Sequence, residues 1–259
     1  MNLIVGDIGN TFTKICLVKI NNLKIKKIIY LDSKKIFSNK ELIKIFKNIN
    51  LGKKINRFAL FSSVVPKYQS RLRSFLKIRY NVILKEIKEK KINKIIKINV
   101  KNKKQLGSDR IANAVGVYKR YREDCIVLDF GTATTFDVVY KNGIYNGGVI
   151  APGINLSIKI LSKSADQIPP FLIKKQKQVI GKNTTEALRS GFYWGYLGLI
   201  NNIILKIEKE TNRKYKIIFT GGYADLFKTS IIRPFTVDRN ITIKGIIELF
   251  KENKKYLYK

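Results

Sequence analysis

The chain has 259 residues, with 52 lysines and arginines against 18 aspartates and glutamates, which gives a formal net charge of +34. Hydrophobic residues make up 45% and aromatic residues 11%, so the composition is that of a folded globule with one large or two modest domains. Histidine is absent, which excludes histidine-based triads, general bases and metal sites. Any general base must be a carboxylate or another non-histidine group.

The positive charge has two interpretations. A nucleic acid or an anionic membrane surface would attract such a chain. Lysine, isoleucine and asparagine are abundant throughout, however, and the lysines lie on many separate segments with few aromatic–basic clusters. We therefore favour a composition bias, and expect nonspecific affinity for polyanions without specific nucleic-acid binding.

The cysteines and the N-terminus indicate the compartment. Cys16 and Cys125 lie in apolar, strand-like runs far apart in the sequence, which predicts buried thiols and neither a disulfide framework nor a zinc site. Asp7 interrupts the short apolar start, so no signal peptide is expected, and no apolar run approaches the length of a membrane span. The sequence predicts a soluble cytoplasmic protein.

Hydrophobic periodicity predicts the elements of the first half. Strands are expected at residues 2–8, 13–20, 23–31 and 57–64, and helices at 40–48 and from Pro66 to about residue 76. Short strands at 82–84 and 95–98 flank a lysine-rich run, residues 85–94, which is expected to be a solvated face or loop.

The second half repeats this order. After Gly107-Ser108-Asp109-Arg110, where Ser108 or Asp109 could simply cap a helix, we expect a helix at 111–121 and strands at 125–129, 135–140 and 144–150. There follow a helix at 154–164, a loop at 171–180, a helix from Asn183 or Thr184 to about 209, a strand at 216–220, a helix to about 227, a strand at 234–237 and a helix at 242–252. The repeat predicts two duplicated domains, residues 1–112 and 113–259.

Three glycine-containing turns suggest phosphate chemistry. The first strand ends in Asp7-Ile8-Gly9-Asn10-Thr11-Phe12-Thr13-Lys14, where glycine allows close approach of a ligand and the polar residues supply short donors and a cation. A similar phrase, Asp129-Phe130-Gly131-Thr132, follows a later strand, and Thr220-Gly221-Gly222 follows another. An ordinary hairpin would explain one copy alone. The three together indicate a nucleotide cleft formed by two facing domains.

These turns resemble the phosphate-one, phosphate-two and adenosine motifs of the acetate and sugar kinase/Hsp70/actin superfamily. Together with Gly107-Ser108-Asp109-Arg110, Gly147-Gly148-Val149-Ile150-Ala151-Pro152-Gly153 and Ile180-Gly181-Lys182-Asn183-Thr184, they are similar in order to type III pantothenate kinases, the Bvg accessory factor-like family. The resemblance implies an α/β fold of two duplicated ribonuclease H-like domains (the actin-like ATPase fold). Each would be a mixed five-stranded sheet with helices, with a cleft between them.

The resemblance also implies a reaction and its residues. The reaction would be ATP-dependent phosphorylation of pantothenate to 4'-phosphopantothenate, the first step of coenzyme A biosynthesis. Asp109 would be the general base, and Asp129 would bind a monovalent cation, potassium or ammonium. ATP would be bound by Asp7, Ile8, Gly9, Asn10, Thr11, Phe12, Thr13, Lys14, Thr132, Gly221 and Gly222, and pantothenate by Val100, Gly107, Ser108, Asp109, Arg110 and Thr184. Mg²⁺ would accompany the phosphates, and the protein would be a homodimer.

Three positions depart from the family pattern. Val100 and Lys103 stand where a tyrosine and a proline are usual, and Tyr223 follows the glycine pair where a small or polar residue is more common. Two alternatives remain. One is a non-catalytic regulatory or nucleic-acid-binding relative of the same fold, which the net charge of +34 makes less remote, and the other is a kinase of another small hydroxy acid. The presence of Asp7, Asp109 and Asp129 argues against the first alternative, whereas Val100 is the best argument for the second.

Overall fold

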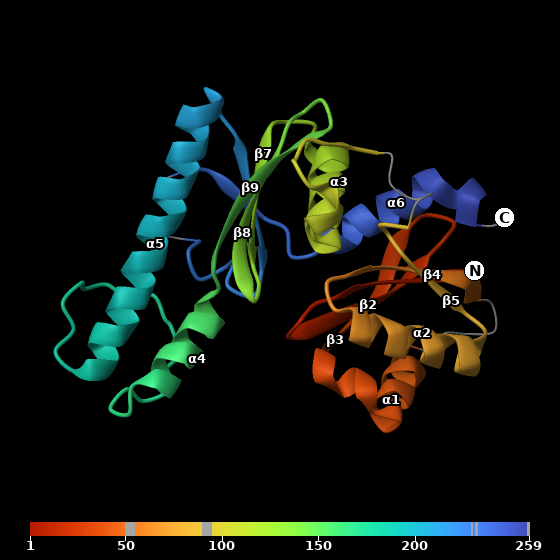
Figure 1. Cartoon of the computed structure of the whole chain (residues 1–259), viewed down its shortest axis with the longest axis horizontal. Coiled ribbons are helices and arrows are strands. Elements are labelled where there is room, and N and C mark those ends of the chain that lie inside the picture. Colours follow the sequence, from red (N-terminus) through yellow and green to blue (C-terminus); the bar gives the residue numbers. More distant parts are fainter. Residues whose placement is uncertain (50–54, 90–94, 229, 231–232, 258–259) are drawn as a thin grey trace. The chain divides into compact units, whose positions relative to one another are not determined.

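The computed structural model describes residues 1–49, 55–89, 95–228, 230 and 233–257. The chain forms two compact units (Figure 1). The first comprises Met1–Arg122, Asn142–Tyr145 and Asn240–Lys259, and the second Glu123–Lys141 and Asn146–Arg239. The sequence predicts that two duplicated domains meet between residues 112 and 113, and this domain boundary stays a prediction.

The elements of the first unit follow the predicted order. Its strands are β1 (Asn2–Ile8), β2 (Phe12–Lys19), β3 (Lys24–Asp32), β4 (Ile55–Ser63), β5 (Ile83–Glu86) and β6 (Lys97–Ile98). Its helices are α1 (Asn39–Ile49), α2 (Pro66–Tyr80), α3 (Ser108–Tyr121) and α6 (Ile241–Leu257), with short 3₁₀ turns η1 (Ser33–Phe37) and η2 (Lys103–Gln105). The five-stranded mixed sheet, in the order β3-β2-β1-β4-β5, confirms the prediction for this half.

Helices cover both faces of this sheet, which explains the nearly continuous apolar run of β1. The helices α1 and α2 lie along one face, as Figure 1 shows, and their apolar residues belong to the core cluster of this sheet. The helices α3 and α6 pack against each other and against β4. In α1, Leu42, Ile45, Phe46 and Ile49 recur at helical spacing and are buried. A strand buried on both faces needs no alternation of polar residues.

The end of α2 determines where β5 begins. Pro66 occupies the first turn, as predicted, and Asn81 ends the helix in the left-handed conformation with φ of 51°. The N–H of Val82 then donates to the carbonyl of Leu76 at 3.1 Å, which turns the chain back into the sheet. This geometry brings the end of β5, at Glu86, beside Phe61 of β4.

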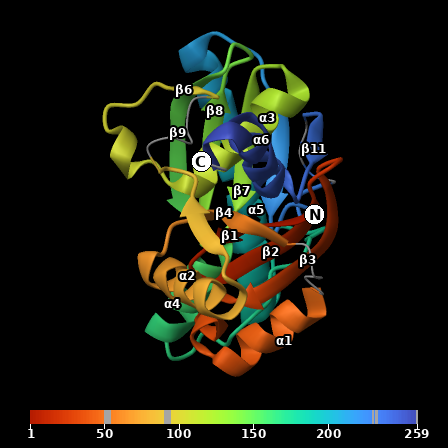
Figure 2. The same cartoon turned by 90° about the vertical axis from the view of Figure 1, so that its right-hand side faces the viewer.

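The second unit contains the remaining elements. They are β7 (Cys125–Phe130), β8 (Ala133–Val139), most of β9 (Ile144–Pro152), α4 (Ile154–Ser164), α5 (Thr184–Thr211), β10 (Lys216–Gly221) and β11 (Phe235–Val237). The sheet order is β11-β10-β7-β8-β9-β6, so this sheet has six strands where five were expected. The additional strand is the predicted short strand near 95–98, because Lys97 and Ile98 pair with Ile144 and Tyr145; Figure 2 shows β6 beside β9.

One predicted helix is absent. Residues 222–228 form consecutive turns, and the N–H groups of Leu226 and Lys228 donate three residues back, to Tyr223 and Asp225, as in a 3₁₀ arrangement. Gly221 has φ of +85° and Gly222 follows it, so two glycines disfavour helix nucleation here. Of the lysine-rich run predicted at 85–94, residues 90–94 lie outside the described residues.

The long helix α5 begins where the sequence predicted. The side chain of Asn183 accepts a hydrogen bond from the N–H of Glu186 at 2.9 Å, and the carboxylate of Glu186 accepts one from the N–H of Lys182 at 2.8 Å. These two hydrogen bonds satisfy N–H groups at the start of the helix, which have no acceptor within the helix itself. They fix the position of Thr184, the first residue of the helix.

Candidate active site

The Asp7–Lys14 turn is a tight hairpin between β1 and β2. The N–H of Gly9 donates to the carbonyl of Phe12 at 3.1 Å, and a Cβ atom on Gly9 would lie 2.8 Å from that oxygen. A side chain at this position would therefore collide with the backbone of the turn. Asn10, Thr11 and Phe12 are exposed at the tip of the turn.

Ser33, which sequence reasoning missed, supports this turn from η1. Its hydroxyl donates to the carbonyl of Gly9 at 2.7 Å and lies 2.8 Å from the hydroxyl of Thr13. The N–H of Ser33 also donates to the carbonyl of Thr11 at 2.9 Å. Thr13 and Ser33 are completely buried, so Thr13 is a supporting residue and not a ligand-facing one. Only the packing of η1 reveals this role, because the two residues are 20 positions apart.

Asp7 and Lys14 are directly opposite each other in the β1–β2 register. Residues opposite each other in an antiparallel pair project to the same face of the sheet. The hydroxyl of Ser62 donates to the Asp7 carboxylate at 2.5 Å from the neighbouring strand β4, and Lys14 lies 5.7 Å from the centre of the Tyr30 ring. The turn thus places a hydrogen-bonded carboxylate and a cation on one face.

The Gly107–Arg110 motif begins α3 and is joined to the end of β4. The hydroxyl of Ser108 accepts from the N–H of Ser63 at 2.7 Å and donates to the carbonyl of Ser63 at 2.9 Å. Since Ser63 pairs with Ile8 of β1, these bonds connect the start of α3 to the strand that carries Asp7. The first unit therefore brings the motif with Asp109 and the phosphate-like turn to the same sheet edge.

Gly107 makes room for the carboxylate of Asp109. A Cβ atom on Gly107 would lie 2.4 Å from Oδ1 of Asp109, and that oxygen accepts a hydrogen bond from the N–H of Arg110 at 2.8 Å. The Arg110 guanidinium lies 5.9 Å from the centre of the Tyr145 ring, within the range of a cation–π contact. Val100 is partly buried between β6 and η2.

The second unit gathers Asp129 with the glycines of the third turn. Asp129 and Thr220 are neighbours in the parallel pair of β7 and β10. Gly221 has φ of +85°, and a Cβ atom there would lie 2.6 Å from backbone atoms of Phe130 and 2.7 Å from Oδ1 of Asp129. Glycine is needed here for both the conformation and the close approach. The exposed residue Gly222 donates its N–H to the carbonyl of Phe130 at 3.1 Å.

Thr132 is exposed in the turn between β7 and β8 and lies against the start of α4. A Cβ atom on Gly153 would be 1.9 Å from the carbonyl oxygen of Thr132, so the N-terminus of α4 packs on this turn only because residue 153 is glycine. Tyr223 donates a hydrogen bond from its hydroxyl to Asn155 of α4. The start of α4, the turn that contains Thr132 and the side chain of Tyr223 are therefore adjacent.

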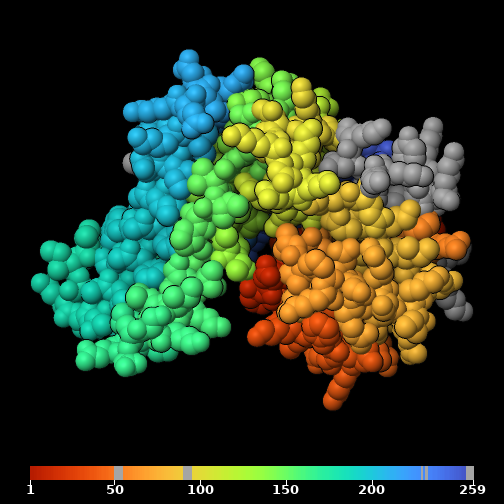
Figure 3. Space-filling view, in the orientation of Figure 1, coloured from red at the N-terminus to blue at the C-terminus, as the bar shows by residue number. Residues whose placement is uncertain are grey.

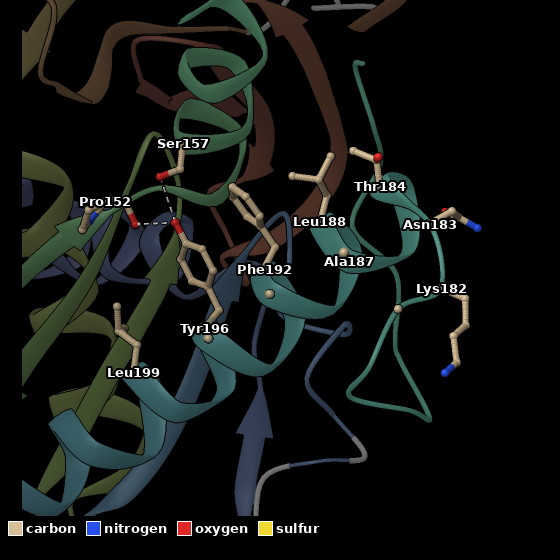
Figure 4. Close-up of a pocket in the computed structure, with 13 residues that line it drawn as sticks. Pro152, Ser157, Lys182, Asn183, Thr184, Ala187, Leu188, Phe192, Tyr196 and Leu199 are labelled. Atoms are coloured by element: carbon tan, nitrogen blue, oxygen red, sulfur yellow. Dashed lines mark hydrogen bonds between the residues drawn. The ribbon is translucent and has the colours of Figure 1, made fainter. Parts of the chain in front are cut away.

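Thr184 lies elsewhere in the second unit, in an apolar pocket of about 890 Å³ (Figure 4). The close-up shows Thr184, Leu188 and Phe192 along α5, with Pro152 and Ser157 opposite. The hydroxyl of Tyr196, on the same helix, is 3.0 Å from that of Ser157 and donates to the carbonyl of Pro152 at 3.3 Å. In the space-filling view α4 and the segment leading into α5, green and teal, lie at the same end of the unit (Figure 3).

In the part of the chain that the structure describes, the carboxylates do not form a preassembled metal cage. Among the described residues, no group of three or more cysteine, aspartate or glutamate side chains is placed to hold an ion. A Mg²⁺ ion bound through one or two carboxylates, waters and phosphate oxygens requires no such cage. Asp7, with its partner Ser62, fits that mode of binding. No helix in the described part of the chain is long and apolar enough to cross a membrane.

Comparison with known proteins identifies the family of this chain. A family model described as type III pantothenate kinase matches residues 3–206. The type III pantothenate kinase of Pelagibacter ubique is 51% identical over 95% of this chain and 97% of its own length. That of Hyphomonas neptunium is 40% identical over 74% of this chain and 76% of its own.

Solved structures show the same fold at low sequence identity. A conserved Baf family protein from Campylobacter jejuni superposes with a TM-score of 0.62 at 22% identity, covering 97% of this chain and 99% of that one. The activator of the 2-hydroxyisocaproyl-CoA dehydratase from Clostridium difficile, with bound ADPNP, gives 0.57 at 12% identity, covering 100% and 97%. These relatives confirm the predicted actin-like ATPase fold. The family match and the identity to curated relatives show that this chain is a kinase belonging to the type III pantothenate kinase family.

Proposed function

We propose that this kinase transfers the terminal phosphoryl group of ATP to the hydroxyl group of pantothenate, with Asp109 as the general base. The family supplies the reaction, which forms 4'-phosphopantothenate at the start of coenzyme A biosynthesis. The observation that supports the residue assignment is the pair of hydrogen bonds between Ser108 and Ser63. They hold the residue before Asp109 at the sheet edge where β1 delivers Asp7.

The Asp7–Lys14 turn would hold the phosphates of ATP. Its exposed tip offers backbone N–H groups and the side chains of Asn10 and Thr11, and Lys14 offers a positive charge. Thr132, Gly221 and Gly222 would complete the nucleotide site, with glycine allowing the backbone to approach the adenosine. Support comes from the packing of Gly153 and Gly221, which leaves no space for side chains around the Thr132 turn and Asp129.

Asp109 would take the proton from the pantothenate hydroxyl as the new oxygen–phosphorus bond forms. A carboxylate is a natural base in a chain without histidine, and correct placement contributes as much as basicity. Arg110 would bind the pantothenate carboxylate, for which a planar guanidinium is suited. Gly107 and Ser108 would line the pocket with backbone groups, and Val100 would supply an apolar wall.

Two kinds of cation would assist phosphoryl transfer, a divalent ion and a monovalent ion. Mg²⁺ neutralises phosphate oxygens during phosphoryl transfer, and the Asp7 carboxylate is the side chain that would help to hold it. Asp129 would bind a monovalent cation, potassium or ammonium, beside the nucleotide. Its carboxylate lies against the backbone of Gly221, so an ion there would contact a rigid oxygen donor in a confined space.

The active protein would be a cytoplasmic homodimer in which Thr184 contacts substrate from across the interface. On α5, Ala187, Gly191 and Gly195 recur every four residues along the pocket, and Cβ atoms on both glycines would meet nothing within 4 Å. Glycine in a helix costs about 1 kcal/mol relative to alanine, so an open glycine face is best explained by a second copy packing on it. The free, buried Cys16 and Cys125 suit a reducing compartment.

A panel of acceptors would test the proposed substrate. The purified protein would be assayed with ATP, Mg²⁺ and potassium, using pantothenate and other small hydroxy acids in parallel. Phosphorylation of pantothenate with the largest kcat/KM is expected. A larger kcat/KM for another hydroxy acid would favour the alternative substrate that Val100 suggests. Sequence-specific binding of a nucleic acid, without turnover of any acid, would favour a regulatory protein.

A further inference from the structure

Three strands of the second unit place oxygen-bearing side chains in one row. Asp129 of β7 lies beside Thr220 of β10 in the parallel pair and opposite Thr135 of β8 in the antiparallel pair. Residues in register on adjacent strands project to the same face of a sheet, with Cβ atoms about 5 Å apart. The adjacent residues Phe130 and Phe219 belong to the apolar core cluster. The carboxylate and the two hydroxyls therefore lie on the face opposite to that core.

The carboxylate of Asp129 approaches β10 more closely than it approaches the turn that leads to β8. A Cβ atom on Gly221 of β10 would lie 2.7 Å from Oδ1 of Asp129. A Cβ atom on Gly131, in the turn to β8, would lie 3.9 Å from the same oxygen. Of the two threonines in the row, Thr220 is thus the one on the strand that this oxygen approaches.

The hydroxyl of Thr220 is buried and unsatisfied. The residue is 1% exposed, and its Oγ1 has no hydrogen-bond partner among the residues that the structure describes. A buried hydroxyl without a partner destabilises a fold, so native structures contain few of them, and an ion or a water molecule is a common reason for one. Thr135, in contrast, is only partly buried, so solvent can satisfy its hydroxyl.

A singly charged ion suits this pair of side chains. The oxygen of a threonine hydroxyl has two lone pairs, which can ligate potassium or accept an N–H of ammonium. Asp129 supplies one negative charge, which balances one positive charge. A divalent ion would need further carboxylates, and in the described part of the chain no group of three or more cysteine, aspartate or glutamate side chains is placed to supply them.

We propose that Thr220 is a ligand of the monovalent cation at Asp129, so that its hydroxyl oxygen and the carboxylate hold the ion between β7 and β10. The inference deepens the cation site of the proposed function and rests on it. Thr220 is followed directly by Gly221 and Gly222, the residues assigned to the adenosine. An ion held by Thr220 would therefore order the glycine turn that the nucleotide contacts.

Two substitutions at position 220 separate the hydroxyl from the shape of the side chain. Thr220→Val replaces the hydroxyl with a methyl group and keeps the branched shape, whereas Thr220→Ser keeps the hydroxyl. Thr236→Val makes the same change on the neighbouring strand β11 and is the control. The Tm of each purified full chain would be measured while KCl replaces choline chloride at constant ionic strength, and again with NH₄Cl. The rise in Tm gives an apparent Kd for each ion.

The loss of the hydroxyl should weaken ion binding without weakening the fold. Thr220→Val should raise the apparent Kd for potassium and for ammonium about tenfold, whereas Thr220→Ser and Thr236→Val should stay within about threefold of the wild type. In choline chloride alone, the Tm of Thr220→Val should be at least that of the wild type, because removing an unsatisfied buried hydroxyl breaks no hydrogen bond. Should Thr220→Val not fold, Thr220→Ala takes its place.

The variant Asp129→Asn, measured in parallel, distinguishes the two ways in which the inference can fail. If Asp129→Asn loses potassium binding but Thr220→Val binds potassium as tightly as the wild type, the role of Thr220 is overturned and the Asp129 site stands. If the Tm of the wild type responds to neither potassium nor ammonium, the cation site of the proposed function is overturned, and the role of Thr220 with it.

Discussion

Ser108 and Ser63 are joined by two hydrogen bonds through one hydroxyl group, which accepts from the Ser63 N–H at 2.7 Å and donates to the Ser63 carbonyl at 2.9 Å. The two residues are 45 positions apart, and their contact connects the end of β4 to the start of α3. The hydroxyl satisfies a donor and an acceptor of a strand end at once. The position of Asp109 therefore depends on the first sheet and not on its own loop alone.

Replacing Ser62 with alanine should weaken the site for ATP. The hydroxyl of Ser62 donates to the Asp7 carboxylate at 2.5 Å, and a hydrogen bond to a charged group is worth about 1.5–3 kcal/mol. We expect Ser62→Ala to raise the KM for ATP roughly tenfold, and to leave the KM for pantothenate nearly unchanged. Initial-rate kinetics with each substrate varied would measure this. Ser70→Ala, an exposed position on α2, is the control, and an equal rise in both constants would contradict the assignment.

Asp129→Asn should abolish the response to potassium. The carboxylate lies against Gly221, and the amide that replaces it carries no charge to attract a monovalent cation. We expect the wild type to show potassium-dependent activity and a potassium-dependent rise in Tm, and the variant to show neither. Asp166→Asn, which changes an exposed loop residue, should behave as the wild type. A variant that retains both responses would remove Asp129 from the proposed cation site.

The local patterns predicted most of the fold. Pro66 at a helix start, the apolar spacing of α1 and the cap residue Asn183 are short-range signals, and the elements they predict occur where expected. The short strand near residues 95–98 was predicted as well, but its place as the sixth strand of the second sheet was not. Lys97 and Ile98 find their partners, Ile144 and Tyr145, only through tertiary contact, and a two-residue strand has almost no periodicity.

The residues of the candidate site likewise fall into those that the sequence revealed and those that only the structure revealed. The glycines and carboxylates of the motifs could be recognised from the sequence, because each stands in a short, ordered phrase. Ser33 and Ser62 could not, since each acts on a residue far away in the chain: Ser33 on Gly9, Ser62 on Asp7. A lone serine in a sequence gives no sign of such a partner. The prediction of a helix after Gly222 is wrong, because Gly221 adopts a positive φ of +85°, which the apolar spacing of the sequence does not reveal.

The two cysteines should resist alkylation in the native protein. Burial raises the pKa of Cys16 and of Cys125 to about 12, so almost no thiolate forms at pH 8, and neither side chain is exposed. Labelling with a thiol reagent should be negligible in buffer and complete in denaturant. Because the pKa of each thiol in the folded protein lies above its ordinary value of 9.0, the stabilising difference is fully present below pH 9 and is lost as the pH rises toward 12. Rapid labelling of folded protein at pH 8 would contradict this.

The glycine face of α5 provides a test of the homodimer. Gly195 lines the pocket and has open space where a Cβ atom would be. If a second copy packs on this face, Gly195→Leu should convert the dimer to a monomer in light scattering and reduce activity, whereas Gly195→Ala should remain dimeric. In a protein that is monomeric throughout, both substitutions would raise the stability by about 1 kcal/mol, through helix propensity alone. That outcome would remove the proposed interface.

The most direct measurement is the formation of 4'-phosphopantothenate by the wild type, Asp109→Asn and Asp166→Asn with ATP, Mg²⁺ and potassium. The wild type and the exposed-loop control should turn over alike. Asp109→Asn should lose a factor of about 10² to 10⁴ in kcat, the range for removing a general base, with an unchanged Tm. Full activity of Asp109→Asn would contradict the assignment of the base, and a folded wild type with no turnover would contradict the proposed reaction in this chain.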